Sequence, residues 1–461
     1  MSSSWSQLPP RLLAIATGVF ALALVVLLRG RTHPDEIFQY LEPAFRSVYG
    51  YGEVAWEWRD GIRNWFAPGL IALLLRGLHA LHVESPRIAM DLLWLLGAIW
   101  HGWGMLGLYR IVERRDGKGP AALAVLLVGT WGAYVLYAPR TLSDALAMPP
   151  LLWAIFFTLR ARDDGDFKSG LLVGLLAGLA VVLRYPSLVF VAPLGVGLLL
   201  ARRWRSIGGM ALGGSLMVVA LGVLDQLTWG AFLHSLRAYL AFNRPGGPVA
   251  QAFGSEPWWW YVLPLGGMMP LVLLPWFVRG LKRFDVLAGA WFFYLATLEV
   301  SAHKEARFVL PLIPLGVAIA IGPFFATLEG WCANRPRRTV GLALAWAAMS
   351  ILSPALQWTV QLDRDLLDAE DLVGGDRELA SVLVWQGGNY SDGGRFHLRR
   401  DVPLDQDGPG PRLGEKLAAG HYSHVMLKPE ASALEALSSA GYALWLTQGS
   451  VQVWKRGAHA R

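Results

Sequence analysis

The sequence predicts an all-α protein that crosses a membrane many times and ends in a small α/β domain. Of its 461 residues, 54% are hydrophobic and only 16% are charged, whereas about 25% are charged in a typical soluble domain. Apolar runs close to the roughly 20 residues that cross a bilayer recur through the first three-quarters of the chain. The 22 Trp residues suit helix ends at the boundary between lipid and water.

About eleven apolar runs are candidate membrane spans. The first lacks a cleavage site of small residues before Arg29, so we expect a retained helix rather than a removed signal peptide. Residues 66–82 are also apolar, but Arg76, His79 and His82 interrupt them, which favours an amphipathic helix at the membrane interface. The predicted spans are 12–28, 89–109, 120–138, 142–160, 169–183, 187–201, 207–225, 258–278, 285–301, 307–326 and 339–356.

Basic residues cluster in every second loop between these spans. The positive-inside rule assigns such loops to the cytoplasm, which predicts an N-terminus inside and a C-terminus outside. Because the net charge of +7 is spread over short loops, we expect no nucleic-acid partner. The lone Cys332 excludes an internal disulfide framework and a cysteine zinc site. The clusters are Arg110/Arg114/Arg115/Lys118, Arg160/Arg162/Lys168, Arg202/Arg203/Arg205, Arg279/Lys282/Arg283 and Arg335/Arg337/Arg338.

Two domains are predicted. Residues 1–356 form a membrane domain whose long outer loops are 29–88 and 226–257. In residues 357–461, turn-rich stretches separate short alternating runs and helix-like segments, a pattern typical of a small α/β domain. With the C-terminus outside, we expect this domain to be soluble and extracytoplasmic.

Two adjacent carboxylates, Asp35 and Glu36, follow the first predicted span. Such groups are costly to hold at a membrane surface without a function, and a sugar transfer needs one base to accept the proton of the attacking hydroxyl. The alternative is a helix start, since Pro34 suits the first helical position and acids suit the first turn. The residues alone leave capping and catalysis equally open.

Two further stretches suggest ligand binding. Trp56-Glu57-Trp58-Arg59, followed by Arg63, alternates aromatic and charged side chains as a carbohydrate-facing surface does, although an interfacial aromatic belt with ion pairs explains this composition better.

Lys304 and Arg307 lie on the side where positive charge is otherwise sparse. Their spacing favours a bound phosphate over a Lys304–Glu305 pair that snorkels to the interface. Isolated outer cations, Arg140 and Arg184, occur on the same side.

The order and spacing of these motifs over residues 12–325 resemble glycosyltransferase family 22, which includes the ER mannosyltransferases of N-glycan and GPI-anchor assembly. Asn64 and Tyr185 depart from the common pattern, which leaves the acceptor open. The motifs are HPDEIFQ, YGYGEVAWEWRDGIRNWFAP, PRTLSDALA, LRYPS, AFN…FGSEPWWWY and SAHKEARFVLPLIP.

The resemblance implies a GT-C fold and an inverting transfer of mannose from polyprenyl- or dolichyl-phosphate mannose to a glycan or glycolipid acceptor. It implies that Asp35 is the base and that Glu36 is the second candidate catalytic carboxylate. We expect the acceptor to be bound by His33, Gln39, Trp56, Glu57, Trp58 and Arg63. We expect the donor phosphate to be bound by His303, Lys304, Arg307, Arg140 and Arg184.

No metal and no other cofactor is expected, because a single phosphate already faced by cations does not require a metal, and no Asp-x-Asp pair or His/Cys cluster suggests one. The alternatives are a GT-C transferase of another sugar, a protein O-mannosyltransferase, or a flippase or transporter of a lipid-linked glycan. A transporter would carry charges near the bilayer midplane or paired broken helices, which this sequence lacks. Its Ala-, Leu- and Arg-rich composition favours a bacterial inner membrane with a periplasmic active site over an ER membrane with a luminal one.

Overall fold

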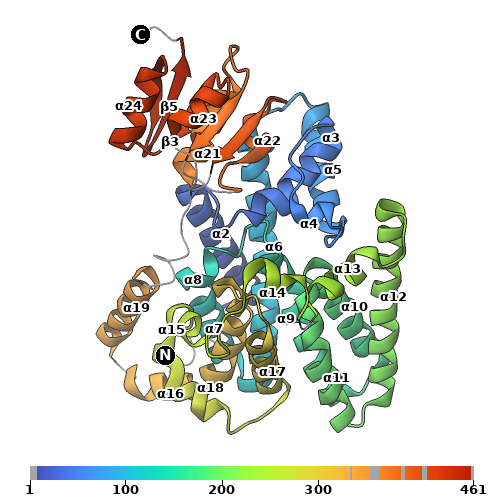
Figure 1. The fold of residues 1–461 in the computed structure, drawn as a ribbon. Coiled ribbons are helices and arrows are strands. Elements are labelled where there is room, and N and C mark those ends of the chain that lie inside the picture. Colours follow the sequence, from blue (N-terminus) through green and yellow to red (C-terminus); the bar gives the residue numbers. More distant parts are fainter. Residues whose placement is uncertain are drawn as a thin grey trace. The chain divides into compact units, whose positions relative to one another are not determined.

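The structure, a computed structural model, describes residues 8–244, 246–332, 335–352, 363–385, 390–407 and 413–457. It is mostly helical, with one five-stranded sheet (Figure 1). The chain divides into two compact units. The helical unit comprises Met1–Leu27, Asp60–Phe66 and Leu92–Val360, and the sheet unit comprises Leu28–Arg59, Ala67–Asp91 and Gln361–Arg461.

The helical unit contains one helix or pair of helices for each predicted span. The last predicted span, 339–356, ends outside the described residues. The elements are α2(Pro10–Leu28), α6(Pro86–Asp116), which begins in the sheet unit, α7(Lys118–Thr130), α8(Gly132–Val135), α9(Ser143–Asp164), α10(Phe167–Leu183), η2(Tyr185–Phe190), α11(Val191–Leu200), α12(Trp204–Trp229), α13(His234–Phe242), α14(Pro248–Phe253), α15(Val262–Met268), η3(Leu271–Leu273), α16(Leu274–Gly280), α17(Val286–Val300), η4(Ala306–Val309), α18(Leu312–Cys332) and α19(Pro336–Ile351).

Among the described residues, five helices are long and apolar enough to cross a membrane: α2, α6, α9, α12 and the stretch Ala306–Cys332. A sixth span results if the pair Val262–Met268 and Leu271–Gly280, bent by 95°, is counted as one. Five shorter apolar helices accompany them. The chain is therefore an integral membrane protein, while the number of eleven spans stays a prediction.

Small residues allow the helices of this unit to pack closely. A Cβ added at Gly170 or Gly174 of α10 would lie 2.0 or 2.1 Å from a backbone oxygen of α12. On α12 the buried positions include Ser206, Gly209 and Gly213, whereas most of its large apolar residues, such as Leu216 and Leu227, are exposed. Small residues inside and large apolar residues outside are typical of helices that face lipid.

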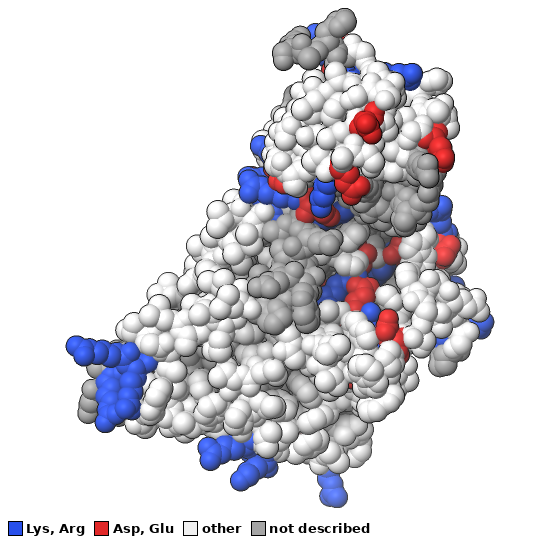
Figure 2. Space-filling view, turned by 60° about the vertical axis from the view of Figure 1, so that its left-hand side comes forward, with Lys and Arg blue, Asp and Glu red and all other residues white. Residues whose placement is uncertain are grey.

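On the surface of the helical unit, apolar and charged side chains occupy different regions. In the space-filling view a broad face carries almost no charged side chains, and Lys and Arg gather at its lower end (Figure 2). The predicted membrane orientation, with the N-terminus inside and the C-terminus outside, rests on the basic loops of this unit and stays a prediction.

The sheet unit has strand order β2-β1-β3-β5-β4. β1 pairs in parallel with β2 and β3, while β5 is antiparallel to β3 and β4. The strands are β1(Val382–Trp385), β2(Leu404–Asp407), β3(His424–Leu427), β4(Tyr442–Gln448) and β5(Val451–Arg456), and the helices are η1(Glu36–Leu41), α3(Glu42–Tyr49), α4(Trp56–Arg59), α5(Phe66–Ala80), α21(Arg364–Gly374), α22(Gly394–Leu398), α23(Leu413–Ala419) and α24(Ala431–Ser439).

Each face of the sheet packs against a hydrophobic core. Val382 and Val384 of β1 point into one core, which also contains Val373 of α21. Leu383, between them, points into the other core with Leu437 of α24. Successive residues of β1 thus enter opposite cores, because the side chains of a strand alternate between its two faces.

Most of the first long loop, residues 29–59 and 67–88, shares the sheet unit with the tail. Arg87 forms an ion pair with Asp368 at 3.1 Å, and Phe45 meets Phe396 edge to face at 6.1 Å between ring centroids. α22 contacts both η1 and α3. The predicted boundary at residues 356–357 lies outside the described residues.

Glu42, at the start of α3, is fully buried in this packing. Its Oε1 accepts the backbone N–H of Phe396 at 2.6 Å, and its Oε2 accepts that of Glu53. Burial raises the pKa of Glu42 to about 8, and the charges of Glu53 and Asp392 act in the same direction. Burial also raises the pKa of Glu53 to about 7.

We therefore predict that the protein loses stability as the pH rises from 5 to 8. In this window Glu42 keeps its proton in the folded protein, whereas the same carboxyl group releases it in the unfolded chain. Folding therefore requires proton uptake, which becomes less favourable as the pH rises. The measurement is the midpoint of thermal unfolding of the purified protein at several pH values. Glu42→Gln should show a weaker pH dependence, and Glu435→Gln, at an exposed position of α24, should keep that of the wild type. An unchanged slope in Glu42→Gln would contradict this assignment.

Candidate active site

The predicted site residues fall into two groups, one in each unit. The acid group, in the sheet unit, consists of His33, Asp35, Glu36, Gln39, Trp56, Glu57 and Trp58. The cation group, in the helical unit, consists of Arg63, Arg140, Arg184, His303, Lys304 and Arg307.

The structure distinguishes the two adjacent carboxylates. Glu36, the first residue of η1, is 1% exposed. Its Oε1 accepts hydrogen bonds from the N–H and the hydroxyl of Thr32, both at 2.6 Å, and from the N–H of His33 at 3.3 Å. Glu36 therefore closes the turn that follows the first membrane helix.

Asp35 keeps part of its side chain accessible. The side chain is 18% exposed, and its Oδ1 lies 3.2 Å from Nδ1 of His33, whose side chain is 32% exposed. A general base must reach the proton that it accepts. Of the two carboxylates, Asp35 has the accessibility that this task requires, and Glu36 holds the turn on which Asp35 lies.

A buried hydrogen-bonded network joins η1 to α4. Gln39 Nε2 donates to Glu57 Oε1 at 2.7 Å, and Trp58 Nε1 donates to the carbonyl oxygen of Gln39 at 3.3 Å. All three side chains are less than 10% exposed. Trp56 is half-buried, and its backbone N–H donates to the hydroxyl of Tyr390 at 3.2 Å.

In the cation group, a carboxylate outside the predicted set binds two arginines. The side chain of Asp144, in the first turn of α9, is 0% exposed. Its Oδ1 lies 3.0 Å from Nη1 of Arg184, and its Oδ2 lies 3.9 Å from Nη1 of Arg307. Both guanidinium groups also face the ring of Phe308, with Cζ to centroid distances of 4.8 and 5.6 Å. The RTLSD motif contained this residue, but nothing in the sequence showed which cations it meets.

Glu305, which was not among the predicted site residues, links Arg307 to His303. Its Oε2 accepts from Nε of Arg307 at 2.5 Å, and its Oε1 lies 2.9 Å from Nε2 of His303.

Lys304 has a different environment, because its side chain is 0% exposed. Its ammonium donates to the carbonyl oxygens of Leu298 and Glu299 at 3.1 and 2.6 Å. Lys304 therefore satisfies carbonyls in the last turn of α17, which have no partner within the helix.

The two remaining cations of the group are Arg140 and Arg63. Arg140 is 1% exposed and its Nε donates to the carbonyl oxygen of Leu136 at 3.0 Å. The carbonyl oxygen of Arg63 accepts from Nε1 of Trp229 at 3.1 Å.

Two guanidinium groups of this group, those of Arg184 and Arg307, meet at the carboxylate of Asp144. Guanidinium groups are well suited to bind an anion such as a phosphate.

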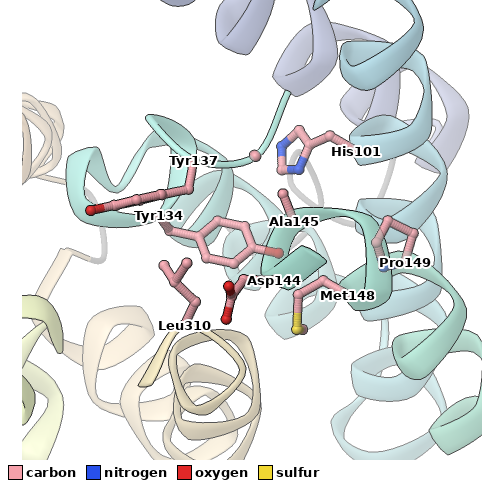
Figure 3. Close-up of a pocket in the computed structure, with 9 residues that line it drawn as sticks. His101, Tyr134, Tyr137, Asp144, Ala145, Met148, Pro149 and Leu310 are labelled. Atoms are coloured by element: carbon pink, nitrogen blue, oxygen red, sulfur yellow. The ribbon is translucent and has the colours of Figure 1, made fainter. Parts of the chain in front are cut away.

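A small pocket lies beside Asp144 (Figure 3). The ring of Tyr134 lies between His101 and the Asp144 carboxylate in this view. His101 is 2% exposed, and its Nε2 has no hydrogen-bond partner among the described residues. Within the described parts of the chain, no group of three or more His, Cys, Asp or Glu is arranged to hold a metal ion. The pocket is lined by His101, Tyr134, Tyr137, Ala138, Asp144, Ala145, Met148, Pro149 and Leu310.

The chain is similar in sequence to known proteins. The Alg9-like mannosyltransferase family matches residues 12–359. Mannosyltransferase APTG1 of Arabidopsis thaliana is 28% identical over 330 residues, which cover 69% of this chain and 59% of that protein. GPI mannosyltransferase 3 of Yarrowia lipolytica is 26% identical over 406 residues, which cover 85% and 75% of the two chains. The chain thus spans less than two-thirds of the length of APTG1.

The fold is similar to that of ArnT from Cupriavidus metallidurans, in a crystal structure bound to undecaprenyl phosphate. The TM-score is 0.62 at 13% sequence identity, and the match covers 97% of this chain and 99% of that one. At this identity the likeness concerns the fold, and it supports the prediction of a GT-C architecture.

We predict that Asp144→Asn destabilises the protein by about 3 kcal/mol, because it removes the carboxylate that lies 3.0 Å from the buried guanidinium of Arg184 and leaves Arg307 with Glu305. The thermal unfolding midpoint in detergent should fall clearly. Asp164→Asn is the matched control, since Asp164 forms exposed ion pairs at the other end of α9 and should cost at most about 1 kcal/mol. Equal midpoints for the two variants would show that Asp144 does not stabilise this cluster.

Proposed function

Because this chain belongs to the Alg9-like mannosyltransferase family, we propose that it is a membrane mannosyltransferase that uses a polyprenyl- or dolichyl-phosphate mannose donor. The predicted resemblance to glycosyltransferase family 22 is confirmed by the match over residues 12–359. This match is the observation that carries the proposal.

The proposed acceptor is a glycolipid. Two observations support it: a relative that covers 85% of this chain is named a GPI mannosyltransferase, and the chain itself is an integral membrane protein with five or six long apolar spans. A membrane-embedded enzyme meets a lipid-linked acceptor without extracting it from the bilayer. The membrane lipid, the lipid-phosphate donor and the acceptor are thus the proposed partners.

The proposed reaction is a single displacement with inversion. The acceptor hydroxyl attacks C1 of the mannosyl group, its proton passes to the carboxylate of Asp35, and the bond between C1 and the phosphate oxygen breaks as the lipid phosphate leaves. The accessibility of Asp35 and its His33 neighbour support it as the base. Glu36, which holds the turn, acts on the orientation of Asp35.

The cation group is proposed to bind the donor phosphate and to stabilise the charge that grows on it as it leaves. Arg184 and Arg307 are the central residues, since guanidinium groups contact phosphate with two donors. Asp144 keeps these two side chains in place. Lys304 already donates to carbonyls of α17, so we assign it to the support of the group, with Arg140 and His303.

The acceptor is proposed to bind near Asp35, with Trp56 in contact with the sugar. Gln39, Glu57 and Trp58 are buried and hold α4 against η1, and we assign them to the support of that surface. Arg63 keeps its proposed role in acceptor binding. Placement of the reaction on the extracytoplasmic face, in a bacterial inner membrane rather than the ER, is part of the proposal.

Asp35→Asn should abolish transfer. We expect the rate of radiolabelled mannose transfer from polyprenyl-phosphate mannose to an endogenous glycolipid to fall by about 100-fold or more, the usual contribution of a general base. Asp60→Asn is the control, because Asp60 is an exposed acid of the same loop. The amount of each variant in the membrane is measured in parallel.

Equal transfer by wild type and Asp35→Asn would exclude Asp35 as the base. Transfer of another sugar, or of mannose to protein, would replace the proposed donor or acceptor. Absence of any transfer by the wild type would favour a transporter.

Transfer should continue without divalent metal. Cations of the protein already face the proposed phosphate, so its charge does not require a metal ion. We expect the rate in the presence of EDTA to stay within about twofold of the untreated rate, a change smaller than the tenfold that corresponds to 1.36 kcal/mol of barrier. Loss of activity in EDTA that added Mn²⁺ restores would contradict this expectation.

A further inference from the structure

A tyrosine of the tail contacts both segments that carry the acid group. Within the sheet unit, the ring of Tyr390 lies 4.8 Å from that of Phe38 at an interplanar angle of 58°. Its hydroxyl accepts the backbone N–H of Trp56 at 3.2 Å. Phe38 belongs to η1, three residues after Asp35, and Trp56 begins α4. Tyr390 thus joins the helix that follows the proposed base to the aromatic segment assigned to the acceptor.

The backbone at Tyr390 has a conformation that its side chain disfavours. Its φ is +62°, a region that glycine or asparagine adopts more readily than a bulky residue. Such positions persist where the surroundings fix them, and they concentrate at functional sites. The N–H of Tyr390 donates to Oε1 of Gln406 on β2, which fixes this conformation.

Arg31 ties the turn after Tyr390 to the loop of the proposed base. Its guanidinium donates to the carbonyl oxygen of Asp392 at 2.6 Å and to that of Ser391, and it lies 3.2 Å from the carboxylate of Asp363. Arg31 is 2% exposed and directly precedes Thr32, a partner of Glu36. The tail and the turn that carries Asp35 are therefore held together by buried contacts.

Tyr390 is also not fully buried. Like Trp56, Tyr390 is half-buried, so part of its side chain remains available to a ligand. An aromatic ring presents an apolar face with a polar end, a combination that suits the apolar C–H face and the hydroxyls of a sugar.

We propose that Tyr390 is an acceptor-binding residue, which packs its ring against a sugar of the glycan acceptor beside Trp56. The inference rests on the proposed function and deepens it, since it gives the tail a part in acceptor recognition. Arg31 is then a positioning residue, which acts through the turn at 391–392.

The test compares Tyr390→Leu with Tyr390→Phe in transfer assays with a synthetic mannose-terminated glycolipid. We expect Tyr390→Leu to raise the acceptor KM about tenfold, the loss that one aromatic contact of typical strength produces. The donor KM and kcat should stay within about twofold of the wild type. Tyr390→Phe, which keeps the ring, should lie much closer to the wild type.

Phe396→Leu is the matched control. Phe396 is a fully buried residue of the same tail segment that packs on Phe45 of the outer loop. It should lower the thermal unfolding midpoint and leave the acceptor KM unchanged. Equal KM values for wild type and Tyr390→Leu, or equal rises in donor and acceptor KM, would overturn the assignment.

A binding measurement separates this inference from the proposed function. Calorimetric titration of the purified full-length protein with a soluble mannose disaccharide needs no transfer. We expect Tyr390→Leu to weaken this binding about tenfold, even if the wild type were to transfer a sugar other than mannose. No binding by the wild type, or equal binding by wild type and Tyr390→Leu, would overturn the role of Tyr390.

Discussion

The need to satisfy every backbone polar group inside the lipid determines the helical unit. Without water, the chain can cross only as helices whose N–H and C=O groups pair internally. The helices then gain stability by close approach, which Gly170 and Gly174 permit between α10 and α12. Large apolar side chains are left for the lipid, as the exposed Leu216 and Leu227 of α12 illustrate. Charged side chains of the cation group accordingly lie where helices start and end.

The cation group shows how charges are kept at such places. Asp144 lies in the first turn of α9, Arg184 directly follows α10, and Arg307 lies in η4, before α18. Each buried guanidinium would be costly alone, and the shared carboxylate of Asp144 offsets that cost. The ammonium of Lys304 is compensated by carbonyls of α17. The guanidinium and ammonium groups that the proposed phosphate contact needs are thus kept in place by partners of the protein itself.

The sheet unit meets the same requirement with partners from distant parts of the sequence. Arg31 and Glu42 of the first long loop are buried, and both bind backbone groups of residues 391–396 in the tail. These contacts connect the turn that carries Asp35 to the sheet, so the tail forms part of the environment of the proposed base.

The sequence by itself determined where helices form and to which family the chain belongs. Long apolar runs leave few alternatives to a helix, and the HPDE and HKE-x-RF motifs are local patterns. Only the tertiary structure decided which side chains meet. It separated the accessible Asp35 from the buried Glu36, brought Asp144 to Arg184 and Arg307, and set Tyr390 against Phe38 and Trp56. The last two sets of partners are 40 to 352 residues apart along the chain. Periodicity and charge pattern report on neighbours along the chain, whereas these contacts depend on packing between elements that the local pattern does not encode.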